Sequence, residues 1–97
     1  MRKYEVVFII RPLEEEATNA VIEKFEKLIA ANGGKIEKED RWGKKRLAYE
    51  IKKEVEGFYV IFYVESEPAC VKECDRVMKI TDEIIKHMIV RSDEKEA

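Results

Sequence analysis

Residues 58–64 (FYVIFYV) form a run of seven residues without a charge, in a chain of which 41% is charged. The run is rich in aromatic and β-branched residues, which is typical of a β-strand. A strand that is apolar at both parities needs cover on both faces, so it belongs in the middle of a sheet. Residues 3–10 share this character, because their second half is apolar at every position. The sequence therefore predicts two central strands.

A helix is expected to begin among the three glutamates at positions 14–16, since carboxylates are favourable near the positive end of a helix dipole. Apolar residues at helical spacing predict its buried stripe. These are Ala17, Val21, Phe25, Leu28 and Ile29. Asn32-Gly33-Gly34 predicts the end of the helix, with a glycine in the left-handed cap position.

A second helix is expected after residue 66, with the hydroxyl of Ser66 as its cap and Pro68 in its first turn. Its predicted buried stripe, which runs up to about Ile80, consists of Cys70, Cys74, Val77 and Met78. The two cysteines lie four residues apart on one helix, a poor geometry for a disulfide. They are also only two of the four ligands of a structural zinc site, so we expect reduced, buried thiols and no metal.

The remaining extended segments are residues 35–42 and 46–52, with Gly43 between them as a candidate bulge, and residues 84–91. A turn is expected at residues 53–57. The resulting order is βαββαβ, and right-handed crossovers place both helices on one face of a four-stranded antiparallel sheet. The predicted fold class is therefore α+β, a ferredoxin-like sandwich.

Ninety-seven residues are enough for one domain, which we assign to residues 1–92, with a short charged tail at residues 93–97. No apolar run approaches the length of a membrane span, and the first residues lack the pattern of a signal peptide. A cytoplasmic protein without membrane contact is the expectation.

The sheet face opposite the helices is expected to carry an apolar and aromatic patch. If Tyr4, Val6 and Phe8 face the helices, the neighbouring side chains of the two central strands face outward. The outward set is then Val7, Ile9, Tyr59, Ile61 and Tyr63. We prefer this parity because tyrosine hydroxyls suit a half-wet surface. Such a patch indicates an interface with a partner, although a second copy or the chain's own tail is an alternative cover.

The one dense basic cluster, residues 41–46, consists of Arg41, Trp42, Gly43, Lys44, Lys45 and Arg46. Its cations suit phosphate contacts, and Trp42 suits stacking on a base or filling a gap in the core. A charged edge strand that blocks aggregation is an equally good reading. Arg2, Lys3 and Arg91 extend the basic surface if the first and last strands are neighbours. The net charge of −2 indicates that any contact with nucleic acid is local.

Catalytic chemistry has no sequence signal in this chain. The only histidine, His87, lies in an apolar strand and reads as a packed residue. No glycine-rich phosphate loop, zinc spacing or nucleophile motif is present. We expect a binding protein without catalytic residues, cofactor, metal or small-molecule substrate.

Residues 43–52, with the sequence GKKRLAYEIK, resemble the signature of the bacterial small-subunit ribosomal protein S-six family. That signature runs glycine, any residue, basic, polar, leucine, small, tyrosine, any, isoleucine, then basic or small, and every position fits. The opening MRKYE, the approach EDRWG and the segment DEIIKHM near the end also resemble the family. Lys86, where the family often has arginine, and the short acidic tail depart from it.

The resemblance implies a structural role in the small ribosomal subunit. Proteins of this family bind the central domain of small-subunit rRNA together with ribosomal protein S-eighteen, as a heterodimer. Carried over to this chain, the expected RNA-side residues are Arg2, Tyr4, Arg41, Trp42, Lys44, Lys45, Arg46 and Arg91. The outward residues of the central strands become the expected surface for the partner. Leu47, Tyr49 and Ile51 have the parity of a packed strand and are expected to be mainly structural.

Two other functions share this topology. Residues 56–63 faintly resemble the third-strand motif of an RNA-recognition motif, but Glu56 replaces the expected cation and Val60 the expected stacking ring. An acylphosphatase-type enzyme needs an arginine near the position of Arg11. The three glutamates that follow at positions 14–16 repel a phosphate and disfavour that reading.

Overall fold

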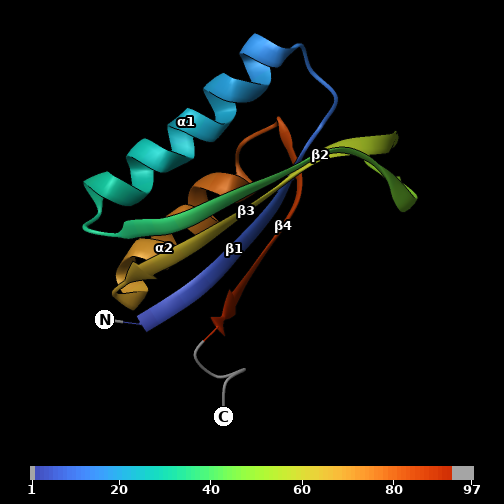
Figure 1. Ribbon diagram of the computed structural model, residues 1–97. Helices are drawn as coiled ribbons and strands as arrows, with labels where there is room; N and C mark the ends of the chain where they lie inside the picture. Colours follow the sequence, from blue (N-terminus) through green and yellow to red (C-terminus); the bar gives the residue numbers. More distant parts are fainter. Residues whose placement is uncertain (1, 93–97) are drawn as a thin grey trace.

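The computed structural model describes residues 2–92, which form one four-stranded sheet and two helices (Figure 1). The elements are, in order, β1 (Arg2–Ile10), α1 (Glu15–Ala31), β2 (Lys35–Ile51), β3 (Glu54–Ser66), α2 (Pro68–Lys79) and β4 (Ile84–Arg91). The strands lie in the order β2-β3-β1-β4, and each neighbouring pair is antiparallel. The predicted ferredoxin-like fold, with β1 and β3 in the centre, is confirmed. The predicted tail at residues 93–97 lies outside the described residues.

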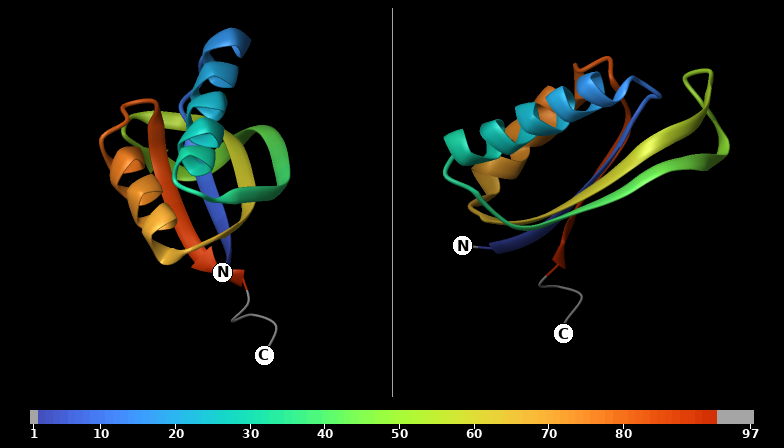
Figure 2. Two further views of the ribbon diagram at one scale, coloured as in Figure 1. Left: turned by 90° about the vertical axis from the view of Figure 1, so that its left-hand side faces the viewer. Right: turned by 45° about the horizontal axis from the view of Figure 1, so that its top comes forward.

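Both helices cover the same face of the sheet (Figure 2), and the main core lies between the two layers. Phe8 of β1 packs against Phe25 of α1 and Phe62 of β3, with ring centroids 5.8 and 5.1 Å apart. All three rings are fully buried. The other core residues of the two central strands are Val6, Ile10, Val60 and Val64. The preferred parity of both strands is thereby confirmed.

The buried stripe of α1 differs from the prediction by one position at its start. Val21, Phe25 and Ile29 are buried as predicted. Ala17 is exposed, whereas Thr18 and Ile22 are buried. Positions 18, 22, 25 and 29 follow the spacing of one helix face, and position 17 lies beside that face.

Two glycines end α1 for different physical reasons. Gly33 has a φ of +81°, which confirms the predicted left-handed position after the C-cap residue Asn32. A Cβ added to Gly34 would lie 2.7 Å from Cγ2 of Ile29 and 2.8 Å from Sγ of Cys70. Gly34 therefore lets the chain turn close against both helices.

The predicted cap of α2 is wrong. Ser66 is the last residue of β3, and its buried hydroxyl donates a hydrogen bond to the carbonyl oxygen of Glu67 at 3.1 Å. The helix begins at Pro68 without a side-chain cap and ends at Lys79, so Ile80 lies just beyond it and is 70% exposed. Neither helix within residues 2–92 has the length and apolar character required to cross a bilayer.

Both cysteines are buried and unpaired, as predicted. The thiol of Cys70 lies 3.7 Å from the carbonyl oxygen of Ile29, which links the two helices. Burial raises the pKa of Cys74 to about 12, and the neighbouring Cys70 and Asp75 add to the effect. The thiols therefore act as small apolar core groups.

The hairpin of β2 and β3 extends past the end of β1, because β1 pairs with β3 only between residues 58 and 66 (Figure 2). The bulge predicted at Gly43 is confirmed: the register shifts between Arg41 and Gly43, and Gly43 has a φ of +84°. The turn predicted at residues 53–57 is wrong. The chain turns at Lys52 and Lys53, with φ values of 51° and 66°, and β3 begins directly after them. Such two-residue turns favour Asn and Gly, so two lysines gave no signal.

A pair of carboxyl groups joins α1 to β2. A hydrogen bond to Glu39, followed by burial, raises the pKa of Glu26 to about 7. Burial alone raises the pKa of Glu39, but hydrogen bonds from Glu26 and Arg41 outweigh that effect and lower it. In weak acid, below about pH 7, the protonated Glu26 therefore donates to an ionised Glu39.

We expect Glu26→Gln to raise the free energy of unfolding at high pH and to leave it nearly unchanged in weak acid. The raised pKa of Glu26 contributes stability that is complete below its ordinary value of 4.5 and is lost as the pH rises through about 7. A glutamine amide donates at every pH. Because solvent screens this partly exposed pair, the gain is about 1 kcal/mol at about pH 8.5.

Urea unfolding at about pH 5.5 and about pH 8.5 measures this difference. Glu16→Gln, at an exposed position of the same helix, is the control and is expected to show little pH dependence. An equal effect of Glu26→Gln at both pH values would contradict the assignment.

Candidate functional site

The open face of the sheet carries the outward side chains of β1 and β3. In the register of these strands Val7 pairs with Ile61 and Ile9 with Tyr59. Their chain neighbours fill the core, so these side chains point away from the helices. Ile9 and Ile61 are buried, with 7% and 6% of their surface exposed. Val7, Tyr59 and Tyr63 are half-buried. The structure therefore brings the five predicted partner residues together on one surface, which we name the open-face strip.

Trp42 joins this surface. Its ring is 52% exposed and lies parallel to the ring of Tyr59, with centroids 6.4 Å apart and an interplanar angle of 8°. Nζ of Lys45 lies 4.8 Å from the centroid of the Trp42 ring. Trp42 is the extra residue of the bulge before Gly43. The sequence grouped it with the RNA-side cations, but the structure places it against the open-face strip.

Met88 is a surface residue that the sequence analysis missed. It pairs with Val7 across β1 and β4 and is 54% exposed. Together with Val7, Ile9 and Tyr59 it lines a hollow of about 220 Å³, with Lys86 at its side. The alternation of residues 84–91, in which Met88 shares a face with Lys86, was the available signal.

The cations of the basic cluster do not form one patch. Lys44, Lys45 and Arg46 lie on the projecting hairpin, opposite residues 58, 57 and 56 of β3. Nζ of Lys44 lies 3.6 Å from Oε2 of Glu56, and both side chains are largely exposed. Since neighbouring residues of a strand point to opposite faces, Lys45 points away from Lys44 and Arg46.

Arg41 is separated from the other cations by its own contacts. Its Nε donates to Oε2 of Glu39 at 2.6 Å, and its Nη1 donates to Oδ1 of Asn19 on α1 at 2.7 Å. The guanidinium therefore ties β2 to α1 beside the Glu26–Glu39 pair. This arrangement occupies donors that the sequence analysis had assigned to RNA.

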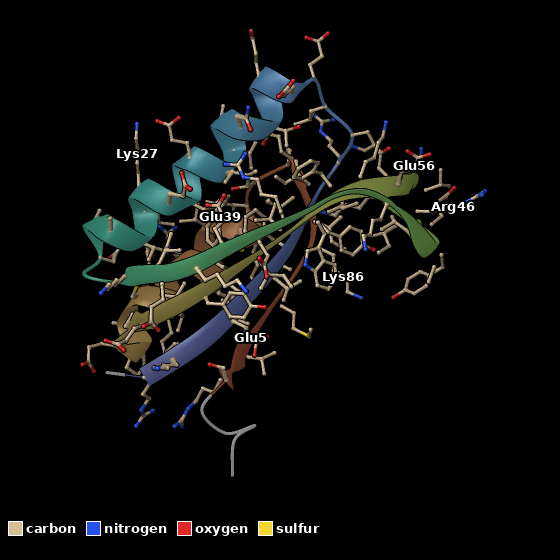
Figure 3. The ribbon with its side chains drawn as sticks, viewed as in Figure 1. Glu5, Lys27, Glu39, Arg46, Glu56 and Lys86 are labelled. Carbon is tan, nitrogen blue, oxygen red and sulfur yellow. The ribbon has the colours of Figure 1, made fainter. Side chains whose placement is uncertain are left out.

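A second cationic end lies at the opposite end of the sheet. Tyr4 pairs with Arg91 across β1 and β4, and Arg2 lies opposite the end of β3. The ring of Tyr4 is 6% exposed, so it acts mainly as a core residue. The nine residues of β1 place Arg2 roughly 26 Å from Ile10, near which the hairpin begins. Figure 3 shows the same separation: Arg46 and Glu56 lie on the hairpin, and Glu5 lies toward the other end of the sheet.

His87 is a packed histidine, as predicted, but it has a partner. Its Nε2 lies 2.7 Å from Oδ1 of Asp75 on α2. Hydrogen bonds from His87 and then Lys79 lower the pKa of Asp75. This contact fastens β4 to α2, and His87 also contributes to the lining of the hollow beside Met88.

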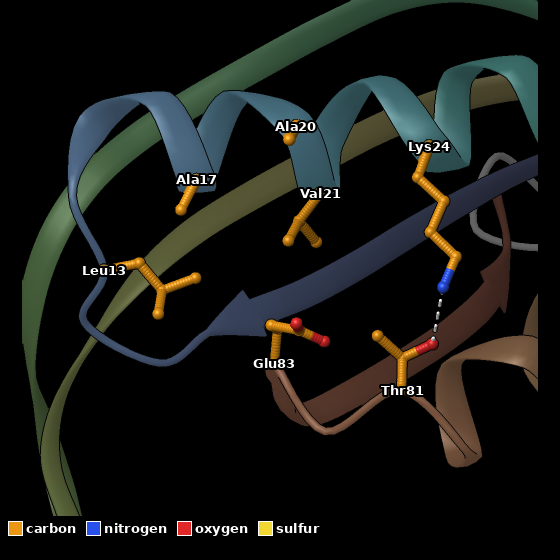
Figure 4. A pocket seen from close by; sticks show the side chains of 7 residues that line it. All are labelled: Leu13, Ala17, Ala20, Val21, Lys24, Thr81 and Glu83. Carbon is orange, nitrogen blue, oxygen red and sulfur yellow. Dashed lines mark hydrogen bonds between the residues drawn. The ribbon is translucent and has the colours of Figure 1, made fainter.

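A hollow of about 320 Å³ lies between α1 and the loop that leads into β4 (Figure 4). Its lining consists of Leu13, Ala17, Ala20, Val21, Lys24, Thr81 and Glu83. Nζ of Lys24 donates to Oγ1 of Thr81 at 3.4 Å, and that hydroxyl donates to the carbonyl oxygen of Val77 at 2.6 Å. These residues provide no activated nucleophile or acid–base pair. Residues 2–92 also contain no cluster of His, Cys, Asp or Glu suited to a metal ion.

The projecting hairpin is fixed by a second apolar cluster. Leu47 is buried against Ile9 and Ile85, and Ile51 and Tyr59 pack around them. Leu47 is thus structural, as the sequence indicated, but it packs outside the main core. Tyr49 is 64% exposed and is not a packed residue, contrary to the prediction from its parity. Its ring lies 5.7 Å from Nζ of Lys86.

Gly57 is required by this packing. A Cβ at this position would lie 2.3 Å from Cγ2 of Ile9 and 3.3 Å from Cδ1 of Ile85. We expect Gly57→Ala to lower the free energy of unfolding by about 1–3 kcal/mol, as overpacking does elsewhere. Urea unfolding measures the change.

Ile9→Ala removes the side-chain atoms that meet the new methyl group. We expect it to destabilise the Gly57→Ala background less than the wild type, which a double-mutant cycle detects. Additive effects of the two substitutions would show that the close approach at Gly57 does not limit the packing.

Comparison with known proteins agrees with this architecture. The family model described as Ribosomal protein S6 matches residues 3–91. The small ribosomal subunit protein bS6 of Moorella thermoacetica is 52% identical over 98% of each chain. The bS6 protein of Exiguobacterium sibiricum is 54% identical over 98% of this chain and 100% of its own. A crystal structure of 30S ribosomal protein S6 from Thermotoga maritima matches with a TM-score of 0.92 and 36% identity, over 98% of this chain and 91% of that one.

Proposed function

Because this chain belongs to the ribosomal protein S6 family, we propose that it binds small-subunit rRNA together with ribosomal protein S-eighteen. In this proposal the open-face strip docks the partner protein, and the two cationic ends contact RNA. The protein works by binding alone, in the cytoplasm, as part of the ribosome. The observation that carries the proposal is the apolar and aromatic strip on the sheet face that no helix covers.

The open-face strip supports a protein partner. Its half-buried Tyr59 and Tyr63 lie on the same face as two exposed side chains at its border, Trp42 and Met88. Aromatic residues and methionine are enriched in protein interfaces, where they supply large contact areas. Lys38 lies over the Tyr63 ring at 5.6 Å and 3.8 Å from Asp40, so a polar rim borders the strip. An apolar centre with a polar rim is the usual anatomy of such an interface.

The cationic ends support a limited contact with RNA. Lys44, Lys45 and Arg46 are exposed on the hairpin, and Arg2 is exposed at the other end of the sheet. The chain as a whole carries a charge of −2, so these local cations have to supply its attraction to phosphates. A shared complex explains this charge, because a basic partner adds phosphate contacts of its own.

We expect Tyr59→Glu to raise the dissociation constant of the heterodimer with S-eighteen by more than about thirtyfold, the effect of losing a central anchor residue. The substitution removes the ring that stacks on Trp42. The new carboxylate also has to give up its hydration when the partner docks, which is unfavourable. Isothermal titration calorimetry with purified S-eighteen measures the affinity, and thermal unfolding checks the fold.

Ile80→Glu is the control, since Ile80 is 70% exposed and lies just beyond α2, outside the open-face strip. The affinity of this variant for S-eighteen is expected to stay within about twofold of that of the wild type. Normal heterodimer formation by Tyr59→Glu would move the docking surface elsewhere.

We expect Lys44→Gln combined with Lys45→Gln to weaken binding of the heterodimer to a central-domain rRNA fragment. Loss of two phosphate contacts makes the plot of log K against log salt shallower by about 1–2 units of slope. Filter binding at several salt concentrations measures both quantities.

Lys27→Gln combined with Lys72→Gln removes two exposed lysines from the helices and is the control. It leaves the sheet cations intact, so affinity and salt slope are expected to match the wild type. If both double variants bind alike, the hairpin does not contact RNA.

A further inference from the structure

The hairpin of β2 and β3 reaches across the end of β1 to β4, at the opposite edge of the sheet. Leu47 makes this contact by packing with Ile9 at the end of β1 and Ile85 at the start of β4. Its side chain is 8% exposed, although its neighbours on both sides are exposed. The buried side chain of Leu47 therefore helps to attach the hairpin, with Ile51 and Tyr59 packed around the same cluster.

Polar contacts join the same two elements on one side of Leu47 in sequence. Nζ of Lys52 donates to the carbonyl oxygen of Ile84 at 3.4 Å. Nζ of Lys86 donates to the hydroxyl of Tyr49 at 3.3 Å. Both lysines bring β4 and the hairpin tip together, but contacts of this length, one part-buried and one exposed, are weak by themselves.

The backbone of residues 44–57 pairs only within the hairpin, because β1 does not pair with this part of β3. An isolated two-stranded hairpin is marginally stable in water. The direction of the hairpin therefore depends on the packing around Leu47, and not on the backbone pairing of the sheet.

We propose that Leu47 is a positioning residue, whose packing between Ile9 and Ile85 holds the hairpin cations at a fixed distance from the cationic end around Arg2 and Arg91. RNA presents its phosphates at defined spacings, so a fixed distance lowers the ordering cost of a two-ended contact. The inference rests on the proposed function for its RNA readout, whereas the attachment of the hairpin is measured without RNA.

The attachment is tested by hydrogen exchange on the full chain. We expect Leu47→Ala to accelerate exchange of the amides in residues 44–57 by about tenfold or more, while amides of α1 and α2 stay protected. Ile85→Ala acts on the same contact from β4 and gives the same pattern. Val55→Ala is the matched control, since Val55 lies on the same hairpin and is 52% exposed. Leu47→Met keeps the volume and is expected to restore protection.

The positioning role is tested by binding of the S-eighteen heterodimer to the rRNA fragment. We expect Leu47→Ala to raise the dissociation constant by about three- to tenfold, the effect of ordering one or two side chains on binding. In the background of Lys44→Gln and Lys45→Gln the same substitution has a smaller effect, because two of the three hairpin cations that it positions are gone. Leu47→Val serves as a milder variant if Leu47→Ala lowers the stability of the whole domain.

The outcomes separate the two proposals. Unchanged exchange of the hairpin in Leu47→Ala overturns the attachment, whatever the RNA result. Faster exchange with undiminished RNA affinity overturns the positioning role. An equal loss of affinity with and without the two lysines also overturns it, because Leu47 then acts through the general fold. Normal RNA binding by the Lys44 and Lys45 double variant instead rejects the hairpin contact of the proposed function.

Discussion

The fold depends on a constraint of coverage: two helices cover one face of a four-stranded sheet and leave the other face bare. On the covered face, Phe8, Phe25 and Phe62 interlock strands β1 and β3 with α1. On the bare face the same two strands carry apolar side chains for which the described chain supplies only partial cover. The hairpin covers one end through Leu47, and Trp42 lies against Tyr59. The proposed partner surface is what remains of this face.

The sequence was sufficient to predict the order of the elements, the central strands and their parity. Each of these follows from a local and redundant signal, such as seven uncharged residues in a row or a glycine pair after a helical stripe. The wrong predictions concern places where one or two residues determine the local backbone structure. The turn at Lys52 and Lys53 has left-handed φ values without the residues that usually adopt them. The hydroxyl of Ser66 bonds a carbonyl oxygen instead of capping a helix.

The candidate site was less predictable because its parts meet through tertiary structure. Residues 41–46 are contiguous in sequence, yet a bulge turns Trp42 toward Tyr59, and Arg41 binds Asn19 of α1 and Glu39 of β2. Alternation along one strand indicates which face Met88 and Leu47 share with other residues, but their neighbours on other strands follow only from the tertiary structure. The predicted partner set came together because alternation along β1 and β3 already determined it. Residues 41–46 did not form one patch because their grouping rested on proximity in sequence, whereas Arg2 and Arg91 lie at the same end of the sheet because the predicted strand order is correct.

The two thiols have a consequence for how the protein ages. A thiolate, and not a thiol, is the nucleophile that reacts with oxidants and alkylating reagents. Cys70 and Cys74 are 2% and 0% exposed, and the pKa of Cys74 is raised to about 12. The folded chain, within the described residues, therefore presents almost no reactive thiol at neutral pH. Oxidative chemistry reaches these cysteines only after the helices part from the sheet, so oxidised cysteine distinguishes copies that have opened from those that stayed folded.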